Sequence, residues 1–118
     1  KHVKQQHADY EYVCGDFLYR KMIAGIVVVS ARSLAEHGPM VTHPGEEFVY
    51  VIEGPVIFAS NHVGVIEGPV IFASAGFAEL TLKTGDCMQF DSSTPHAWFC
   101  ATDKDARLLF NTTDPRWE

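Results

Sequence analysis

The chain has 118 residues, with 9 lysines and arginines against 15 aspartates and glutamates, and a formal net charge of −6. Hydrophobic residues make up 47% of it and aromatic residues 12%, which excludes a disordered chain and fits one globular domain. The acidic balance argues against nucleic-acid binding, and no apolar run reaches the about 18 residues of a membrane helix. We therefore expect neither a nucleic-acid partner nor a membrane span.

The start of the chain is polar and has no signal-peptide pattern. The three cysteines, Cys14, Cys87 and Cys100, have neither the spacing of a zinc ribbon nor that of a disulfide framework. We expect reduced thiols and a cytoplasmic protein.

In chain order, residues 1–9 are polar and are predicted to form a tail. From residue 10 onward, short runs of Val, Ile, Phe and Tyr alternate with clusters of Gly, Pro, Asp and Ser, which is typical of strands joined by turns. Gly15-Asp16 predicts a hairpin between strands 10–14 and 17–20. Further strands are predicted at 23–32, 46–52, 56–59, 65–73, 77–82, 88–90, 96–101 and 106–112. Helical periodicity is nearly absent, so we predict a single all-β domain over 10–118, an antiparallel sandwich or barrel.

Ten residues, 51–60, recur without change at 65–74. We interpret them as a tandem duplication of one strand and its turn. The period of 14 is even, so a copy shifted by one period keeps its side chains on the same face of a sheet. We expect the first copy to stay in the strand that is joined directly to Glu47, and the second to pair with 77–82. Residues 61–64 would then form the added turn.

The segment around Pro44-Gly45 has an unusual carboxylate. Pro-Gly predicts a turn, and alternation in the strand that follows places Glu47 on the same face as Val49 and Val51. A carboxylate among valines needs a partner, and His43 lies four residues earlier, across the turn.

His96 opens a later strand, and with His43 and Glu47 it completes a set of two histidines and one carboxylate at strand starts. That set binds Fe(II), Zn or Ni, and the open positions polarise a substrate oxygen or activate water. The other interpretation is a hydrogen-bonded polar pocket without a metal. Candidates for binding a ligand are Trp98, Cys100 and Tyr50, although most aromatic residues of this kind belong to a core. The sequence assigns no catalytic residue.

These motifs resemble those of the cupin superfamily. His43, Glu47 and Gly54 match the second histidine, the glutamate and the glycine of its first motif, and Gly85 and His96 match the second motif. The resemblance implies a double-stranded β-helix, the cupin jelly roll.

Residues 45–54 and 85–96 also resemble the C-terminal cupin sensor domain of bacterial helix-turn-helix regulators, although no helix-turn-helix precedes them here. Two departures from the family pattern matter. Val41 occupies the place of the family's first metal-binding histidine, which leaves three ligands. The spacing to Gly85 is 31 residues from Gly54 but 17 from Gly68, and the shorter value is the usual one. The duplication therefore looks like an insertion into an ordinary cupin.

Three functions remain open. The first is a sensor-like module that binds a small metabolite, with or without one divalent ion (Fe, Zn or Ni). The second is a metal-dependent cupin enzyme, a dioxygenase or isomerase. The third is a structural domain that mainly dimerises. Because small cupins commonly pair through their sheets, the resemblance implies a homodimer in all three cases.

Overall fold

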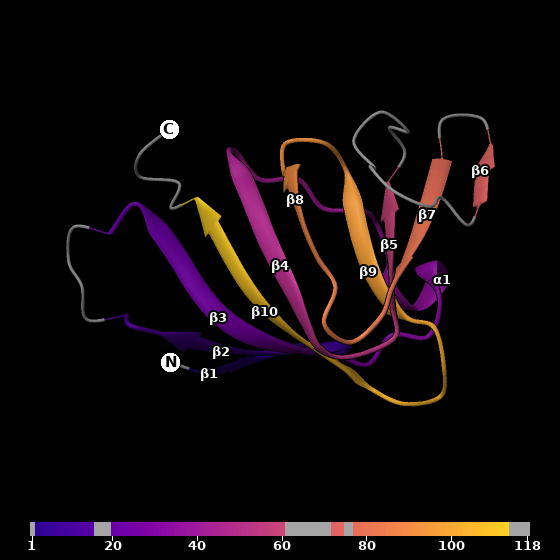
Figure 1. Ribbon diagram of the computed structural model, residues 1–118, viewed down its shortest axis with the longest axis horizontal. Coiled ribbons are helices and arrows are strands. Elements are labelled where there is room, and N and C mark those ends of the chain that lie inside the picture. The colour runs from indigo at the N-terminus through magenta and orange to yellow at the C-terminus, as the bar shows by residue number, and fades with distance from the viewer. Residues whose placement is uncertain (1, 16–19, 61–71, 75–76, 114–118) are drawn as a thin grey trace.

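The computed structural model describes residues 2–15, 20–60, 72–74 and 77–113, which form two antiparallel sheets (Figure 1). In the view of Figure 1, a six-stranded sheet lies on the left and a four-stranded sheet on the right. The helix α1 (Leu34–His37) is four residues long, and no helix in the described part of the chain is long and apolar enough to span a membrane.

The six-stranded sheet has the spatial order β1 (His2–Lys4), β2 (Ala8–Val13), β3 (Met22–Val29), β10 (Ala106–Thr113), β4 (Glu46–Glu53) and β8 (Cys87–Asp91). The four-stranded sheet has the order β6 (Phe72–Ser74), β7 (Phe77–Leu82), β5 (Val56–Ser60) and β9 (His96–Cys100). The predicted all-β jelly roll is confirmed.

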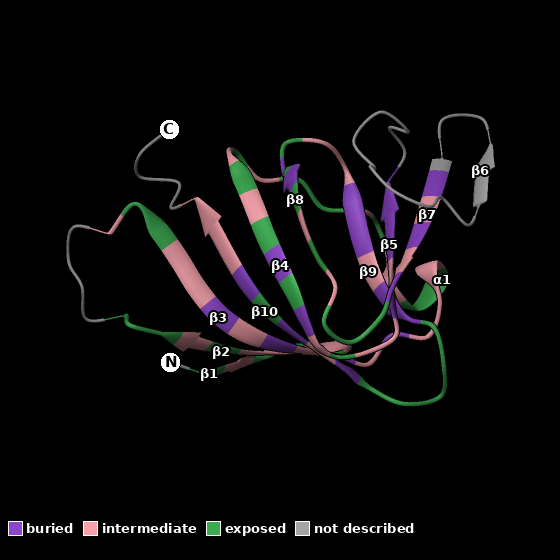
Figure 2. Cartoon of the chain, viewed as in Figure 1, coloured by how far each residue is buried: buried purple, intermediate pink, exposed green. Residues whose placement is uncertain are grey.

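Alternation along β4 separates the core from the outer face of the six-stranded sheet (Figure 2). Val49 and Val51 are fully buried, whereas Phe48 and Tyr50 are 37% and 39% exposed. Glu47 lies on the inward side with the valines, as its position two residues before Val49 predicts. The core between the sheets is therefore continuous with a polar site at the start of β4.

The predicted N-terminal tail is wrong, because residues 2–4 form a strand. β1 pairs with β2 in an antiparallel hairpin, with Val3 opposite Tyr10. The turn is closed by a hydrogen bond from the backbone N–H of Gln5 to the carbonyl of Ala8 (2.7 Å). A polar segment can serve as an edge strand because the backbone supplies the pairing.

The partner of the second strand also differs from the prediction. Within the described residues, the two edges of β2 pair with β1 and β3. Arg20 lies outside the strands, and 17–19 lie outside the described residues. β3 ends at Val29, three residues before the predicted end. The chain there crosses to the other sheet, where the carbonyl of Ala31 accepts a hydrogen bond from the backbone N–H of Cys100 (2.7 Å).

The two copies of the duplicated segment lie on opposite edges of β7. In the first copy, residues 51–53 end β4 and residues 56–60 form β5, which pairs with β7 and β9. Of the second copy, β6 pairs with β7 as predicted, while residues 61–71, including the predicted turn, lie outside the described residues. The registers differ: Phe58 is opposite Leu80, but its counterpart Phe72 is opposite Glu79. In the four-stranded sheet, β5 therefore holds an inner position, and β6 lies at the edge of the strands that the structure describes.

Candidate metal centre

The His43–Glu47 pair is held by a tight turn. Gly45 has a φ of 96°, a conformation that glycine adopts without strain. The backbone N–H of His43 donates to the carbonyl of Ser92 (2.9 Å), and the N–H of Ser92 donates to the carbonyl of Gly45 (3.0 Å). The turn is thus fastened to the β8–β9 connection. It brings Nε2 of His43 within 3.0 Å of Oε1 of Glu47, whose side chain is only 12% exposed.

His96 enters the same site from the facing sheet. It opens β9 and is 2% exposed, with its ring centroid 4.8 Å from that of Phe90. Nδ1 lies 2.9 Å from the carbonyl oxygen of Thr94. Because a carbonyl only accepts hydrogen bonds, Nδ1 carries the proton and Nε2 keeps a lone pair. Metal-binding histidines are oriented by a second hydrogen bond of this kind.

Burial keeps the His96 imidazole neutral. Desolvation is the main cause that lowers its pKa, and the charges of His43 and His37 act in the same direction. The hydrogen bond with Thr94 and the negative charge of Glu47 oppose the shift. A neutral imidazole is the form that binds a metal ion.

The ligand atoms of His43, Glu47 and His96 all lie within 4.8 Å of one another. Two ligand atoms about 2.1 Å from one ion, at right angles around it, are about 3.0 Å apart, which is the separation of the His43–Glu47 pair. Nδ1 of His43 lies 3.3 Å from the hydroxyl of Thr112, so its Nε2 also points to the site. Two imidazoles and one carboxylate suit Fe(II) and similar divalent ions and leave coordination positions open. The residues therefore fit such an ion.

A cavity of about 330 Å³ adjoins the three ligands inside the jelly roll. Its deep walls are apolar and come from both sheets: Val27, Val29, Val49, Trp98, Leu108 and Phe110. Its exposed end is polar, with Gln5, Gln6 and His7 from the β1–β2 turn and Glu36 and His37 from α1.

Tyr10 is the phenol that lines this cavity. Its ring meets Phe110 edge-on at 5.9 Å, and desolvation, with smaller contributions from Tyr12 and Glu47, raises its pKa. The hydroxyl is therefore neutral at physiological pH and can donate a hydrogen bond. Gly25 makes room for the Phe110 ring, since a Cβ there would lie 2.8 Å from it.

Only one of the three predicted ligand-binding residues reaches the cavity. Trp98 lines it. Tyr50 lies on the outer face of the six-stranded sheet, opposite Leu109. Cys100 is buried in the core next to Arg32, and its thiol donates to the carbonyl of Val29 (2.9 Å). Neither of these two is among the residues that line the cavity.

Sequence reasoning missed the residues of the N-terminal hairpin. His7, within the segment predicted to be a tail, lines the cavity with Tyr10, and so does His37 of α1, although neither histidine belongs to the group of three ligands. The sequence signal is weak: the alternation of acidic and aromatic residues at Tyr10 and Glu11 extends only to Asp9 of the predicted tail.

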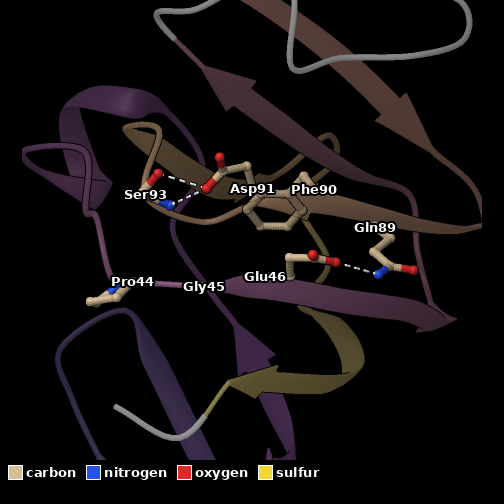
Figure 3. Close-up of a pocket in the computed structure, with 7 residues that line it drawn as sticks. All are labelled: Pro44, Gly45, Glu46, Gln89, Phe90, Asp91 and Ser93. Atoms are coloured by element: carbon tan, nitrogen blue, oxygen red, sulfur yellow. Dashed lines mark hydrogen bonds between the residues drawn. The ribbon is translucent and has the colours of Figure 1, made fainter. Parts of the chain in front are cut away.

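A larger and more open groove, about 700 Å³, runs along the outward side of β4 and β8 (Figure 3). Its polar groups already bind each other: Nε2 of Gln89 donates to Glu46 (2.7 Å), and the Ser93 hydroxyl donates to Asp91 (2.6 Å). The Ser93 contacts lower the pKa of Asp91. The described residues that line the groove include no histidine, so we place the functional site in the inner cavity.

Comparison with known proteins identifies the family. The family model of the cupin domain matches the sequence over residues 33–111, about two thirds of the chain. The chain therefore belongs to the cupin family. No curated protein matches it.

Several solved structures share the fold. Fe(II)-HppE with the alternative substrate (S)-1-HPP has a TM-score of 0.69 at 20% identity, over 95% of this chain and 55% of that one. Hydroxypropylphosphonic acid epoxidase from S. wedmorenis has a TM-score of 0.70 at 20% identity, over 95% and 54%. The plu4264 protein from Photorhabdus luminescens has a TM-score of 0.67 at 13% identity, over 98% and 82%. The chain spans about half the length of the epoxidase chains.

Proposed function

We propose that this cupin binds one divalent transition-metal ion, with Fe(II) as the favoured ion, and that it binds a small molecule beside the ion. The ion would be bound by Nε2 of His43, a carboxylate oxygen of Glu47 and Nε2 of His96. The observation that carries the proposal is the convergence of these three atoms within 4.8 Å of one another at the wall of an inner cavity.

The chain's own residues have defined tasks in this arrangement. Thr94 fixes the tautomer of His96, and the hydroxyl of Thr112 orients His43. Glu47 supplies the negative charge that offsets the ion in a largely buried site. When bound, such an ion supplies a Lewis acid and exchangeable positions for a ligand oxygen. The apolar walls around Trp98 exclude water from the bound molecule.

A sensor-like role follows from the resemblance of residues 45–54 and 85–96 to the sensor domains of regulators. In that role, ligand binding at the ion would be passed on to a partner. The second candidate is a metal-dependent enzyme of the dioxygenase or isomerase kind. It is favoured by the three-ligand set, which leaves room for a substrate, and by the Fe(II) named for the structural neighbour HppE.

Metal analysis after anaerobic loading with Fe(II) tests the proposal. We expect one ion per chain in the native protein and His2→Ala, and almost none in His96→Ala. His2 is the matched control because it is an exposed histidine bonded to Asp9, away from the site. Equal metal contents of all three proteins would contradict the assignment. Oxygen consumption by the loaded protein with candidate ligands identifies a dioxygenase, and conversion of the ligand without oxygen consumption identifies an isomerase; a sensor gives neither.

A further inference from the structure

We propose that the molecule bound in the cavity has an apolar body and at most one negative charge, and meets the ion through two neighbouring oxygens, as in a hydroxyketone. Phosphonates and phosphate esters are excluded as its ligands. This inference rests on the proposed metal site and names the class of molecule that the site takes.

The first argument is the charge of the cavity. Its described lining contains two carboxylates, Glu36 and Glu47, and no lysine or arginine; its basic side chains are the imidazoles of His7, His37, His43 and His96. The seven cationic side chains of the described ranges lie elsewhere: Lys4, Arg20, Lys21, Arg32, Lys83, Lys104 and Arg107. Two of them are committed to carboxylates, Arg32 to Asp105 (2.9 Å) and Arg107 to Glu53 (3.3 Å).

This charge distribution disfavours a dianion. A phosphonate that leaves water needs charged hydrogen-bond donors, which proteins supply from arginine and lysine. A divalent ion bound to the Glu47 carboxylate and two neutral imidazoles leaves one positive charge. A singly charged ligand neutralises it, whereas a dianion leaves an uncompensated negative charge facing Glu36.

The second argument is the wall chemistry. From Val27 and Leu108 to Trp98, the deep end of the cavity offers hydrocarbon and aromatic surface, which gains free energy by covering an apolar body. The volume of about 330 Å³ corresponds to roughly eleven water molecules in the liquid, which is the space of one ring with short substituents.

The third argument is the number of ligands. Three protein ligands leave up to three positions of an octahedral ion open. Two neighbouring oxygens of one molecule occupy two of them and fix its orientation. The Tyr10 hydroxyl, neutral and facing the same cavity, is a donor that an uncharged or singly charged oxygen accepts.

The test compares two probes of similar size, maltol, a neutral hydroxyketone, and phenylphosphonate, by calorimetry on the protein loaded with Fe(II) under anaerobic conditions. Metal content is measured first. We expect maltol to bind at least about ten times more tightly than phenylphosphonate. Phenylphosphonate binding as tightly as maltol, or more tightly, would overturn the inference while leaving the metal site intact.

A charge-introducing variant separates electrostatics from simple chelation. Val41 lines the cavity and is 48% exposed, so a long side chain fits there without repacking the core. We expect Val41→Arg to raise the ratio of phenylphosphonate to maltol affinity at least about tenfold above that of Val41→Gln, its neutral control with a long polar side chain. A gain of the same size in Val41→Gln would contradict the charge argument.

Failure of the proposed metal site is recognised separately, because the metal content is measured before ligand binding. If no ion is bound, the proposed function fails, and the comparison is made on the metal-free protein with benzyl alcohol and phenylphosphonate. Preference for benzyl alcohol still supports the apolar, uncharged character of the cavity. Preference for phenylphosphonate overturns it.

Discussion

Oε1 of Glu47 lies 3.0 Å from Nε2 of His43, across the two-residue turn formed by Pro44 and Gly45. This distance fits a hydrogen bond in the metal-free protein, and it also fits two neighbouring ligand atoms around one ion. The site is therefore preorganised: the carboxylate and imidazole need little movement to admit a metal, and the turn that holds them is fixed to the β8–β9 connection.

Removing the charge of Glu47 should weaken metal binding. Glu47→Gln keeps the shape and the contact with His43 but lacks the anionic oxygen. We expect Fe(II) affinity to fall by at least about 100-fold, beyond the effect of losing an outer-shell partner. Titration against a chromophoric chelator measures it. Glu46→Gln is the matched control, because Glu46 is exposed on the outer face, and a comparable loss there would contradict the assignment.

Restoring a fourth ligand should strengthen metal binding. Val41 stands beside His96, with backbone hydrogen bonds in both directions (2.9 and 3.0 Å), and its side chain lines the cavity. Val41→His places an imidazole at the position of the first metal-binding histidine of the family motif, where this chain has valine. We expect metal affinity to rise at least about tenfold in the same titration, with Val41→Ala unchanged. If Val41→His behaves like Val41→Ala, position 41 does not face the ion.

The metal-binding residues could be predicted because their signals are local. Alternation from Val49 and Val51 places Glu47 inward, and the Pro-Gly turn brings His43 back to it. The pairing of His96 with this pair is non-local, and its prediction rested on the place of all three residues at strand starts and on the motif resemblance.

The rest of the cavity could not be predicted in the same way. Tyr50 lies an odd number of residues after Glu47 in the same strand, so its side chain is on the opposite, outward face. Cys100 shares the face of His96 but lies four residues, about 13 Å, further along the strand. The β1–β2 turn closes the cavity through backbone pairing, which leaves little trace in a polar sequence. The homodimer and the cytoplasmic location stay predictions.

Acidification should destabilise the metal-free protein through His96. Burial lowers its pKa below the ordinary 6.5, so the unfolded chain binds a proton that the folded protein does not. Well above pH 6.5, His96 contributes no pH dependence to the free energy of unfolding. Below pH 6.5 its contribution lowers that free energy as the pH falls, until the pH reaches the pKa of His96 in the folded protein. The slope is at most about 1.4 kcal/mol per pH unit.

Urea unfolding in the presence of a chelator, between pH 5 and 8, measures this dependence. We expect His96→Gln to show a shallower loss of stability between pH 6.5 and 5 than the native protein. The carboxylates titrate in both proteins, so the difference between the two curves isolates His96. Parallel curves would show that its imidazole is protonated equally in both states.

The thiols should differ sharply in reactivity. Cys14 and Cys87 are exposed, whereas Cys100 is 2% exposed and burial raises its pKa despite the nearby Arg32 guanidinium. A thiol held protonated and covered is a poor nucleophile. We expect iodoacetamide at pH 8 to modify Cys14 and Cys87 at least about 100 times faster than Cys100, as followed by peptide mass spectrometry.

Unfolding is the internal control for this experiment. In denaturant, all three cysteines should react at similar rates. Rapid modification of Cys100 in the folded protein would mean that the contact between its thiol and the carbonyl of Val29 opens readily.

The duplicated segment should be dispensable for folding. Deleting 61–74 gives the same sequence as deleting 51–64, because the copies are identical. Ser60 pairs with Ala78 in the structure, so the deletion joins them through Ala75, Gly76 and Phe77. A three-residue connection that contains glycine is a common hairpin loop.

The shortened chain therefore keeps β5 between β7 and β9, and of the described strands it loses only β6. We expect it to fold, with a strand-type circular dichroism spectrum, a cooperative thermal transition and a metal content equal to that of the full chain. His96→Ala in the shortened chain is the control for metal specificity. If the deletion variant fails to fold, the second copy stabilises the core, and the inner position of β5 depends on the edge strand that covers β7.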